Sequence, residues 1–291
     1  MATTSSPRLG VAFVPTLPPE ALPDLAHAAD EHLDDLWVWE DCFKQSGVAS
    51  AATALALTRR VRVGLGLMPA PLRNVALAAM EVATVARLFP GRFVPGVGHG
   101  VQEWMGQTGS RVASPMTLLE EYTEALARLL AGEEVTTEGR YVRLDRVRLD
   151  WPPTTPVTVM SGGHGPRTLA LAARLADGIL LAGGLGHEDL RSAVETVRGA
   201  RPAGAPAPEV VHTLMADTGP GADERVAADL AAWGLAPTDG RAVAGDAATV
   251  ADAVRRCAEL GATTVVLQPA SATDAAAFVG WVGREVRPLL P

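Results

Sequence analysis

The amino-acid sequence predicts an α/β protein whose fold is a (β/α)8 TIM barrel. Short apolar runs alternate with segments in which apolar residues recur at the three-to-four spacing of a helix face, along almost all of the 291 residues. The sequence contains eight such apolar runs that alternate with helical segments, and eight strands are the number that closes a TIM barrel. An open doubly wound sheet would place a G-x-G-x-x-G turn after its first strand, and here that turn reads FVPTLPPE.

The predicted strands are short apolar runs that end at proline, glycine or polar residues. They are 8–14, 36–38, 61–67, 92–97, 157–160, 178–182, 209–216 and 263–267. The predicted helices are 19–33, 47–58, 73–88, 115–130, 168–175, 187–198, 222–233, 247–260 and 272–289. In helix 73–88 we expect Leu77, Met80 and Leu88 to belong to one broad apolar face. Met80 and Trp281 are both expected to be packing residues.

One segment, at about 132–156, interrupts this alternation. On both sides of Gly139 polar and apolar residues alternate with a period of two, which predicts a small β-hairpin. The hairpin precedes the fifth predicted barrel strand, and the rhythm of strand and helix resumes after it. We therefore expect residues 1–291 to form a single barrel domain with one short insertion.

Composition and charge indicate a small molecule as the partner. Apolar residues make up 48% of the chain, and the net charge is −8 with no run of Lys or Arg longer than a pair. We therefore expect no nucleic acid and no membrane as partners. Cys42 and Cys257 are too few for a disulfide framework, the N-terminus lacks the features of a signal peptide, and no apolar stretch is long enough to span a membrane. The expected location is cytoplasmic.

The unusual residues of the sequence follow the predicted strands, at the end of a barrel where active sites form. Glu40, Asp41 and Cys42 come directly after the second strand. A carboxylate pair there can carry out acid–base chemistry or hydrogen-bond a heterocycle, whereas Cys42 is either a proton donor or a small apolar filler. Glycine-containing loops follow other strands, at Gly66-Leu67-Met68, Gly96 to Gly100, and Gly183-Gly184.

The segment Ser161-Gly162-Gly163-His164-Gly165-Pro166-Arg167 lies between a predicted strand and a predicted helix. Backbone N–H groups, a helix N-terminus and an arginine together favour an anion such as phosphate. The segment is not a Walker A loop, because the sequence G-K-[ST] is missing. The alternative is an ordinary glycine-rich loop that carries a surface arginine.

Histidine and aromatic residues give less specific signals. The six histidines show no metal-binding spacing, so no metal is expected. His99 and His164 lie in glycine loops on the expected active face, where each is predicted to contact substrate or cofactor. Trp104 and Met105 either form an apolar wall for a ring or belong to the core.

Five groups of motifs follow one another along the chain. They are LWVWEDCF at 36–43, VGLGLM at 63–68 with PLRN at 71–74, LFPGRF at 88–93, GVGHG at 96–100 with EWM at 103–105, and SGGHGPR at 161–167 with ADG at 176–178. In this order they resemble the bacterial luciferase-like monooxygenase superfamily, and most of all its branch that uses the deazaflavin coenzyme F-420. The resemblance extends from about residue 8 to residue 184 and is weaker beyond. It implies a TIM barrel with an insertion before the fifth strand.

The resemblance also implies roles for individual residues. In the F-420 branch a non-proline cis peptide backs the middle ring of the cofactor, and the matching bond here joins Gly66 to Leu67, before Met68. Asp41 matches the acidic residue that contacts the deazaflavin. The remaining expected cofactor contacts come from the neighbouring Glu40, from the ring border and from the phosphate loop: Gly96, Gly98, Gly100, Trp104, Ser161, Gly162, Gly163, Gly165, Pro166 and Arg167.

One position departs from the family pattern. Relatives in the F-420 branch commonly have Asp-His where this chain has Asp41-Cys42, so the histidine assigned to proton transfer is missing there. The remaining routes for the proton are Cys42, His99 or exchange with water.

The resemblance implies an oxidoreductase that moves a hydride between bound F-420 and a small organic substrate, with Asp41, Cys42 and His99 as the catalytic candidates. An FMN-dependent monooxygenase of the same superfamily is the alternative, and a non-catalytic flavin-binding relative is a second alternative. Relatives often dimerise, and an apolar helix face exposed on the monomer would be the physical sign of a homodimer.

Overall fold

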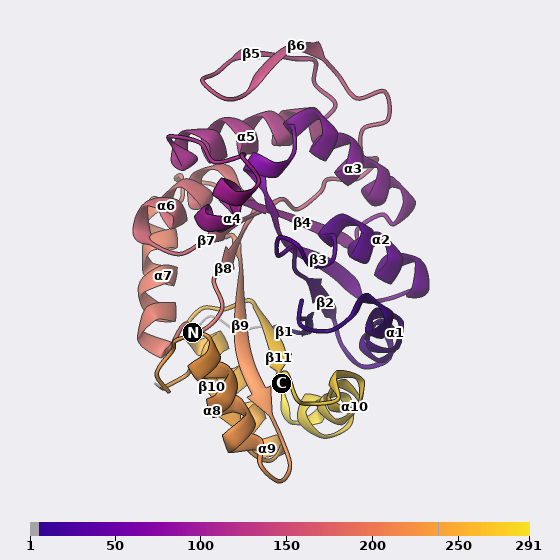
Figure 1. Ribbon diagram of the computed structural model, residues 1–291, viewed down its shortest axis with the longest axis vertical. Coiled ribbons are helices and arrows are strands. Elements are labelled where there is room, and N and C mark those ends of the chain that lie inside the picture. The colour runs from indigo at the N-terminus through magenta and orange to yellow at the C-terminus, as the bar shows by residue number, and fades with distance from the viewer. Residues whose placement is uncertain (1–5, 238) are drawn as a thin grey trace.

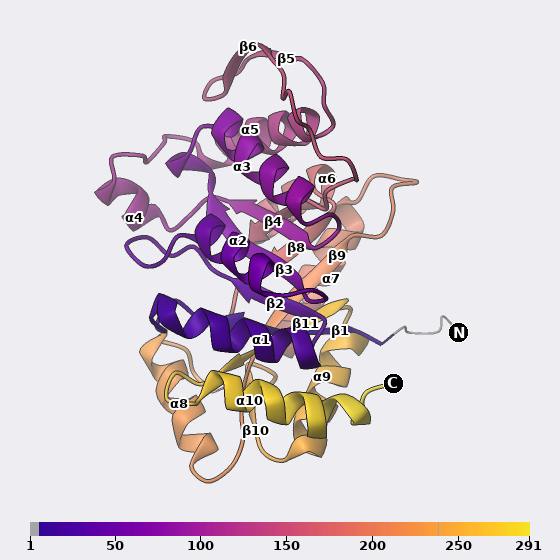
Figure 2. The same cartoon turned by 90° about the vertical axis from the view of Figure 1, so that its right-hand side faces the viewer.

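The computed structural model, which describes residues 6–237 and 239–291, is a closed barrel of parallel strands inside a ring of helices (Figures 1 and 2). Within the described residues eight strands form the barrel, and hydrogen bonds between the last strand and the first close it. In barrel order they are β1 (Arg8–Phe13), β2 (Asp35–Val38), β3 (Arg62–Pro69), β4 (Phe93–Gly98), β7 (Met160–Gly163), β8 (Gly178–Leu181), β9 (Glu209–Asp217) and β11 (Thr264–Pro269). The predicted TIM barrel is confirmed.

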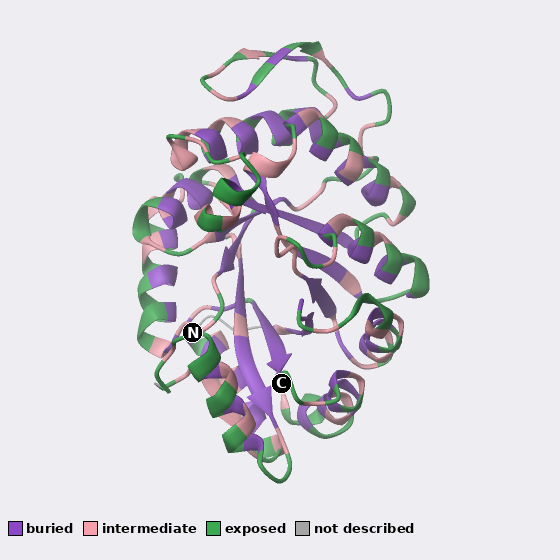
Figure 3. Ribbon diagram, in the orientation of Figure 1, coloured by how far each residue is buried: buried purple, intermediate pink, exposed green. Residues whose placement is uncertain are grey.

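The helices that surround the barrel bury their inner sides against it, while their outer sides are exposed (Figure 3). They are α1 (Leu22–His32), α2 (Gly47–Leu57), α3 (Val75–Leu88), α4 (Gln102–Gln107), α5 (Pro115–Leu130), α6 (Pro166–Leu175), α7 (His187–Ala200), α8 (Ala222–Ala232), α9 (Ala247–Glu259) and α10 (Ala275–Trp281). In the part of the chain that the structure describes, none of them has the length and hydropathy that crossing a membrane requires.

Most predicted elements differ from the structure by one to three residues at their ends, and two differ in a way that has a physical cause. The fifth barrel strand was expected at 157–160 but is β7, Met160–Gly163, because the Ser-Gly-Gly sequence pairs with both β4 and β8 and this pairing overrides its low strand propensity. The last helix was expected to be continuous over 272–289. Instead α10 ends at Trp281 and passes into a π-helical turn, Val282–Val286, and a 3-10 turn, Arg287–Leu289.

The outer face of α3 contradicts the expected packing of this helix. Leu77, Met80 and Leu88 are 46%, 57% and 67% exposed, so the prediction that they form the buried face was wrong. The side of α3 that meets the barrel is built mainly from alanine and valine: Val75, Ala78, Ala79, Val82, Ala83, Val85 and Ala86. These small side chains let the helix lie close to the strands, which leaves the larger ones outside. Trp281 does pack against the core, as predicted.

The inserted hairpin forms as predicted and lies over α5, at the top of Figure 1. Its strands β5 (Val135–Glu138) and β6 (Arg143–Val147) pair with each other in a separate two-stranded sheet. Glu121 of α5 accepts hydrogen bonds from the backbone N–H groups of Arg140, Tyr141 and Val142 at 2.8, 2.8 and 3.0 Å. Although partial burial raises the pKa of Glu121, these hydrogen bonds outweigh it and lower the pKa below its usual value. A charged carboxylate therefore fastens the hairpin to the barrel.

Strand β9 changes partners halfway along its length. Its first residues pair with β8, in the register Gly178 with Glu209 and Leu180 with Val211. Its last residues pair instead with a short additional strand that the sequence did not predict, β10 (Ala242–Ala244). The barrel is thus closed at its N-terminal end, whereas β8 and β9 part toward the C-terminal end.

Charged side chains occupy the N-terminal end of the barrel. Asp35 accepts hydrogen bonds from Arg8 at 2.7 Å and from Arg62 at 2.8 Å, and Arg62 also pairs with Glu209. Thr264 donates a hydrogen bond to Glu209 at 2.7 Å. Burial by itself lowers the pKa of Arg62, but the two carboxylates outweigh this effect and raise it. Because the buried charges are paired, this network closes the lower end of the barrel without leaving an isolated charge.

Above this network the indole of Trp37 fills the barrel against Gly64 of β3. A Cβ atom at Gly64 would lie 2.4 Å from two ring carbons of Trp37, which no real side chain tolerates. Trp37 itself is 2% exposed. The glycine is therefore required by the volume of the neighbouring indole.

We predict that Gly64→Ala destabilises the protein by about 1–3 kcal/mol, because the added methyl group overlaps the indole of Trp37, which has to leave its place against β3. Gly106→Ala is the matched control, since Gly106 lies in α4 with no atom within 4 Å of the added methyl group. It should be neutral, or stabilise the protein by up to about 1 kcal/mol. Urea unfolding of the two variants measures the difference, and equal unfolding free energies would contradict the packing described here.

Candidate active site

A cavity of about 870 Å³ opens among the C-terminal ends of the barrel strands. Residues of β3, β7, β8, β9 and β11 line it, together with the segments that follow β2 and β4. The sequence-predicted residues that line it are Glu40, Asp41, Gly66, Leu67, His99, Gly100, Trp104, Gly162, Gly163, His164 and Arg167. These residues are far apart in the sequence, and the barrel brings them together around one space.

Leu67 forms the β3 wall of the cavity, next to a cis peptide bond between Gly66 and Leu67. The register of β3 against β4 shifts between Leu65 and Met68, so the strand bulges at this point. A Cβ atom at Gly98 would lie 2.5 Å from Leu67, and one at Gly162 would lie 2.4 Å from it. Two neighbouring strands therefore leave the volume into which the Leu67 side chain fits.

Several residues expected to touch the cofactor lie behind this wall. Gly98 makes room for Leu67, and a Cβ atom at Gly96 would lie 2.4 Å from Leu180, which lines the cavity. Met68 is fully buried, and Ser161 is 1% exposed. The cavity lining does not include Met68, Gly96, Gly98, Ser161, Gly165 or Pro166. In this structure Gly96 and Gly98 leave room for the side chains of the wall, Met68 and Ser161 are buried, and Gly165 and Pro166 lie outside the lining.

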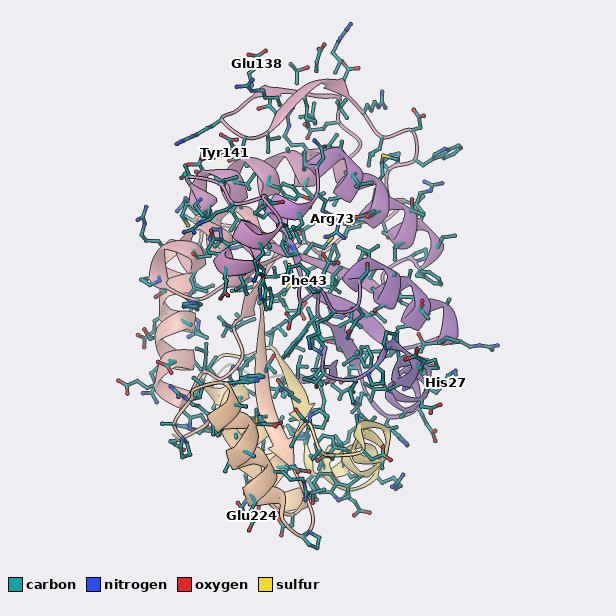
Figure 4. The ribbon with its side chains drawn as sticks, in the orientation of Figure 1. His27, Phe43, Arg73, Glu138, Tyr141 and Glu224 are labelled. Carbon is teal, nitrogen blue, oxygen red and sulfur yellow. The ribbon has the colours of Figure 1, made fainter. Side chains whose placement is uncertain are left out.

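Glu40 lines the cavity, but its carboxylate is held by other groups of the protein. It forms an ion pair with Arg73 and accepts a hydrogen bond from the backbone N–H of Gly47 at 2.8 Å. Arg73 also pairs with Glu81 at 3.1 Å. Glu40 thus joins the segment after β2 to the start of α2 and to the residues before α3. Arg73 is labelled in Figure 4.

Asp41 and Cys42 differ in their relation to the cavity. Asp41 lines it, and burial raises the pKa of this carboxyl although the charge of Lys44 opposes the shift. Cys42 is partly buried but is not part of the lining. Burial, followed by the negative charges of Glu40 and Asp41, raises the pKa of the Cys42 thiol. Cys42 is therefore a protonated thiol at neutral pH.

His99 faces the cavity from the segment after β4. Its Nε2 lies 3.2 Å from the hydroxyl oxygen of Thr168, which belongs to α6. Its Nδ1 is buried and has no hydrogen-bond partner among the described residues. Burial lowers the pKa of His99 below its usual value, so the ring is neutral at neutral pH. A neutral imidazole here can accept or donate one hydrogen bond to a bound molecule.

The predicted anion site lies at the start of α6, next to the Thr168 side chain that contacts His99. Gly162 and Gly163 end β7, and Gly165 takes a φ of 92°, which favours glycine, immediately before the helix begins at Pro166. His164 and Arg167 line the cavity. Over residues 6–237 and 239–291, Arg167 has no carboxylate within ion-pair distance. An unpaired guanidinium beside a helix N-terminus suits a phosphate.

Trp104 and Met105 take different roles. Trp104 lines the cavity from α4, whereas Met105 is fully buried and contacts the chain near Gly100. Helix α4 was not predicted, because its six residues are too few to show a helical period.

Within the described residues, no group of three or more His, Cys, Asp or Glu side chains is arranged to hold a metal ion.

The sequence-based reasoning missed the part of the lining that comes from β8, β9 and β11. Leu180, Val211, Thr213 and Val266 line the cavity, as does Trp37 of β2. The period-two spacing of Val211 and Thr213 marks them as one face of a strand. Nothing in their composition distinguished that face from an ordinary core.

The sequence also identifies the family to which the chain belongs. Residues 2–239 match the family described as luciferase-like monooxygenase, and the chain belongs to this family. The predicted resemblance is confirmed at this level.

Two curated relatives illustrate the similarity. The chain is 29% identical over 205 residues to a 5,10-methylenetetrahydromethanopterin reductase of Methanolobus tindarius, a match that covers 69% of this chain and 62% of the relative. It is 33% identical over 184 residues to an F-420-dependent glucose-6-phosphate dehydrogenase of Nakamurella multipartita, covering 57% of this chain and 53% of the relative. The chain therefore spans less than two thirds of the length of these relatives.

Solved structures share the fold over the whole chain. The coenzyme F-420-dependent tetrahydromethanopterin reductase of Methanopyrus kandleri superposes with a TM-score of 0.84 at 20% identity, covering 99% of this chain and 100% of that one. The monooxygenase RslO1 of Streptomyces bottropensis also gives a TM-score of 0.84 at 20% identity, covering 97% and 99%. At this identity the similarity establishes the fold, which a reductase and a monooxygenase share.

We predict that the thiol of Cys42 reacts with iodoacetamide half-maximally above pH 9, because alkylation requires the thiolate and the pKa is raised above its ordinary value of 9.0. Asp41→Asn should move this midpoint to lower pH, since one of the nearby negative charges is removed. Cys257 does not interfere, because it is fully buried and burial raises its pKa to about 12. A wild-type midpoint below pH 9, or an unchanged midpoint in the variant, would refute this account of the site.

Proposed function

We propose that this protein is an oxidoreductase that transfers a hydride between the deazaflavin coenzyme F-420 and a small organic substrate. The observation that carries the proposal is a single cavity that joins an apolar wall at Leu67 to an unpaired cation at Arg167. A cofactor with a flat ring system and a phosphate needs both. The F-420-dependent glucose-6-phosphate dehydrogenase and the F-420-dependent tetrahydromethanopterin reductase described above support this choice of cofactor.

The residues of this chain fit such a cofactor. Leu67 would lie behind the ring system, and Trp104 would border it. Arg167, His164 and the N-terminal turn of α6 would hold the phosphate by charge and by backbone N–H groups. When bound, a deazaflavin supplies hydride transfer, because carbon replaces nitrogen at the position that carries the hydride. The protein would orient the ring toward the substrate and exclude water.

Asp41 and His99 are the side chains proposed to handle protons. Both line the cavity, and burial acts on both in the direction that favours the neutral form. Asp41 would hydrogen-bond the heterocycle of the cofactor, and His99 would hold or transfer a proton at its free Nδ1. Cys42 fits this role less well, because it is outside the lining and its thiol has a raised pKa.

An FMN-dependent monooxygenase is the second candidate function. FMN also carries a phosphate and a flat ring system, so the same cavity suits it, and several structures with this fold are monooxygenases. Cofactor identity decides the reaction, since reduced FMN reacts with oxygen whereas a reduced deazaflavin does so poorly. A non-catalytic flavin-binding relative is a third candidate, and the main argument against it is that Asp41, His99 and Arg167 line one cavity.

Titration of the purified protein with F-420 and with FMN, followed by fluorescence, separates these functions. We expect F-420 to bind more tightly, and we expect reduction of a redox dye with F-420 and not with FMN. Tight FMN binding with oxygen consumption would establish the monooxygenase instead. Binding of a cofactor without turnover of any electron acceptor would leave the non-catalytic reading.

We predict that Arg167→Ala weakens F-420 binding by about 2 kcal/mol or more, the contribution expected of a charge-assisted hydrogen bond to phosphate. Arg174→Ala is the matched control, because Arg174 lies on the same helix but is exposed and faces Glu120. Its F-420 affinity should equal that of the wild type. Equal affinities for all three proteins would exclude Arg167 from the phosphate site.

We also propose that the protein is a cytoplasmic, single-domain subunit of a homodimer. Both cysteines are free, which suits a reducing compartment. The outer surface of α2 carries no charged residue, and the neighbouring α3 exposes Leu77, Met80 and Leu88 beside it (Figure 1). An uncharged apolar surface of this kind is complementary to a second copy of itself.

We predict that Met80→Lys shifts the protein toward monomer, because the new charge would be buried against the uncharged surface of the partner. Leu289→Lys is the control, since Leu289 is similarly exposed but lies in the C-terminal 3-10 turn. Sedimentation velocity at several protein concentrations gives the result. A monomeric wild type, or a Met80→Lys variant that remains a dimer, would rule out this interface.

A further inference from the structure

The part of the cavity lining that no cofactor contact accounts for is without charge. Its side chains come from β2, β8, β9 and β11, and they are Trp37, Trp39, Leu181, Val211, Thr213 and Val266. The titratable lining residues are Glu40 and Asp41, which follow Trp39 on the segment after β2, His99 after β4, and His164 and Arg167 after β7. The side of the cavity that β8, β9 and β11 form is therefore uncharged.

A pair of tryptophans from distant parts of the chain forms the upper edge of the apolar side. The ring centroids of Trp39 and Trp233 lie 6.5 Å apart with an angle of 48° between the planes. Trp39 lines the cavity after β2, and Trp233 follows α8 and packs against Gly183, which also lines it. Two large indole faces thus stand together where β8 and β9 have separated.

The opening of the cavity is apolar as well. Phe43, Val101 and Trp233 are among the large apolar side chains that this protein exposes, and Phe43 is 71% exposed. Val101 lines the cavity, and Figure 4 shows Phe43 near the centre of the ring of helices. Exposed apolar side chains gathered around a cavity mark a binding groove for an apolar ligand.

Two polar groups belong to the apolar side, and one of them has no hydrogen-bond partner among the described residues. The indole Nε1 of Trp37 is buried and makes no hydrogen bond with any residue in the described part of the chain. Thr213 contributes a hydroxyl to the same side. Trp37 offers a hydrogen-bond donor only, and a threonine hydroxyl can donate or accept. In the cavity, the Thr213 hydroxyl can donate a hydrogen bond to a carbonyl oxygen, which only accepts, whereas Nε1 of Trp37 is buried within the wall.

We propose that the substrate is an uncharged, apolar carbonyl compound with a planar ring system, bound against Trp39, Trp233 and the side chains of β9 and β11. This inference rests on the proposed function, because it assigns Arg167 and His164 to the phosphate of the cofactor. With those cations occupied, a phosphate or carboxylate on the substrate would be buried against Val211 and Val266 without a counter-charge, which is strongly unfavourable. A phosphorylated sugar is excluded on this ground.

The test is a calorimetric titration of the full chain loaded with F-420, using 2-acetylnaphthalene and glucose 6-phosphate as the two probes. We expect the ketone to bind and the sugar phosphate to give no binding heat. Trp39→Ala and Trp233→Ala should each weaken ketone binding by about tenfold, while F-420 affinity is measured separately in each variant. Trp39→Phe, which keeps an aromatic face, should retain most of the affinity.

Trp151→Ala is the matched control, because Trp151 is exposed, lies outside the cavity and stacks on Arg87. Its ketone affinity should stay within about twofold of the wild type. Binding of glucose 6-phosphate, wild-type ketone affinity in both tryptophan-to-alanine variants, or loss of F-420 binding together with ketone binding would each overturn the assignment.

The same ketone titration on the cofactor-free protein separates this inference from the proposed function. Ketone binding that depends on Trp39 in a protein that fails to bind F-420 would remove the proposed cofactor and keep the apolar substrate site. F-420 binding without any ketone binding would keep the proposed function and refute the substrate class.

Discussion

The cavity of this protein depends on the fit of Leu67 into space that glycines on two neighbouring strands leave empty. Gly98 of β4 and Gly162 of β7 would each place a Cβ atom within 2.5 Å of the Leu67 side chain. The β3 bulge and the wall that it presents therefore exist only because those strands carry no side chain there. Glycines next to a cofactor site are usually explained by contact with the ligand. Here they are needed first by the packing of the protein against itself.

Local patterns in the sequence predicted much of the fold, and long-range packing explains most of what they missed. The hairpin around Gly139 and the order of the barrel elements follow from periods of two and of three to four, which short segments display by themselves. The buried face of α3 was assigned wrongly, because leucine and methionine suggested burial while the close approach of the helix admits only alanine and valine. Strand β7 was displaced because Ser161 and Gly162 pair with strands on both sides.

Only part of the candidate site was predicted, because some of its residues are recognisable from the sequence and others only from the packing of the fold. Asp41, His99 and Arg167 carry chemical groups that are conspicuous in a sequence, and all three line the cavity. Val211, Val266 and Trp233 carry none, and only the folded barrel shows that they lie beside the same space or at its edge. Charged side chains also differ in whether they are paired within the protein. Asp35 and Arg62 are paired at the closed end of the barrel, whereas Arg167 is left without a carboxylate partner, within the described residues, at the open end.

The change of partner along β9 bears on how this protein can evolve. The lower residues of β9 complete the barrel through β8, while its upper residues belong with β10 and with α8, which carries Trp233 at its end. Substitutions or insertions between β9 and β11 can therefore reshape one side of the cavity without breaking barrel closure. The segments that carry Leu67 and Arg167 lie outside this region and are not disturbed. One side of the cavity can thus change while the strands that close the barrel and the segments that carry Leu67 and Arg167 are kept.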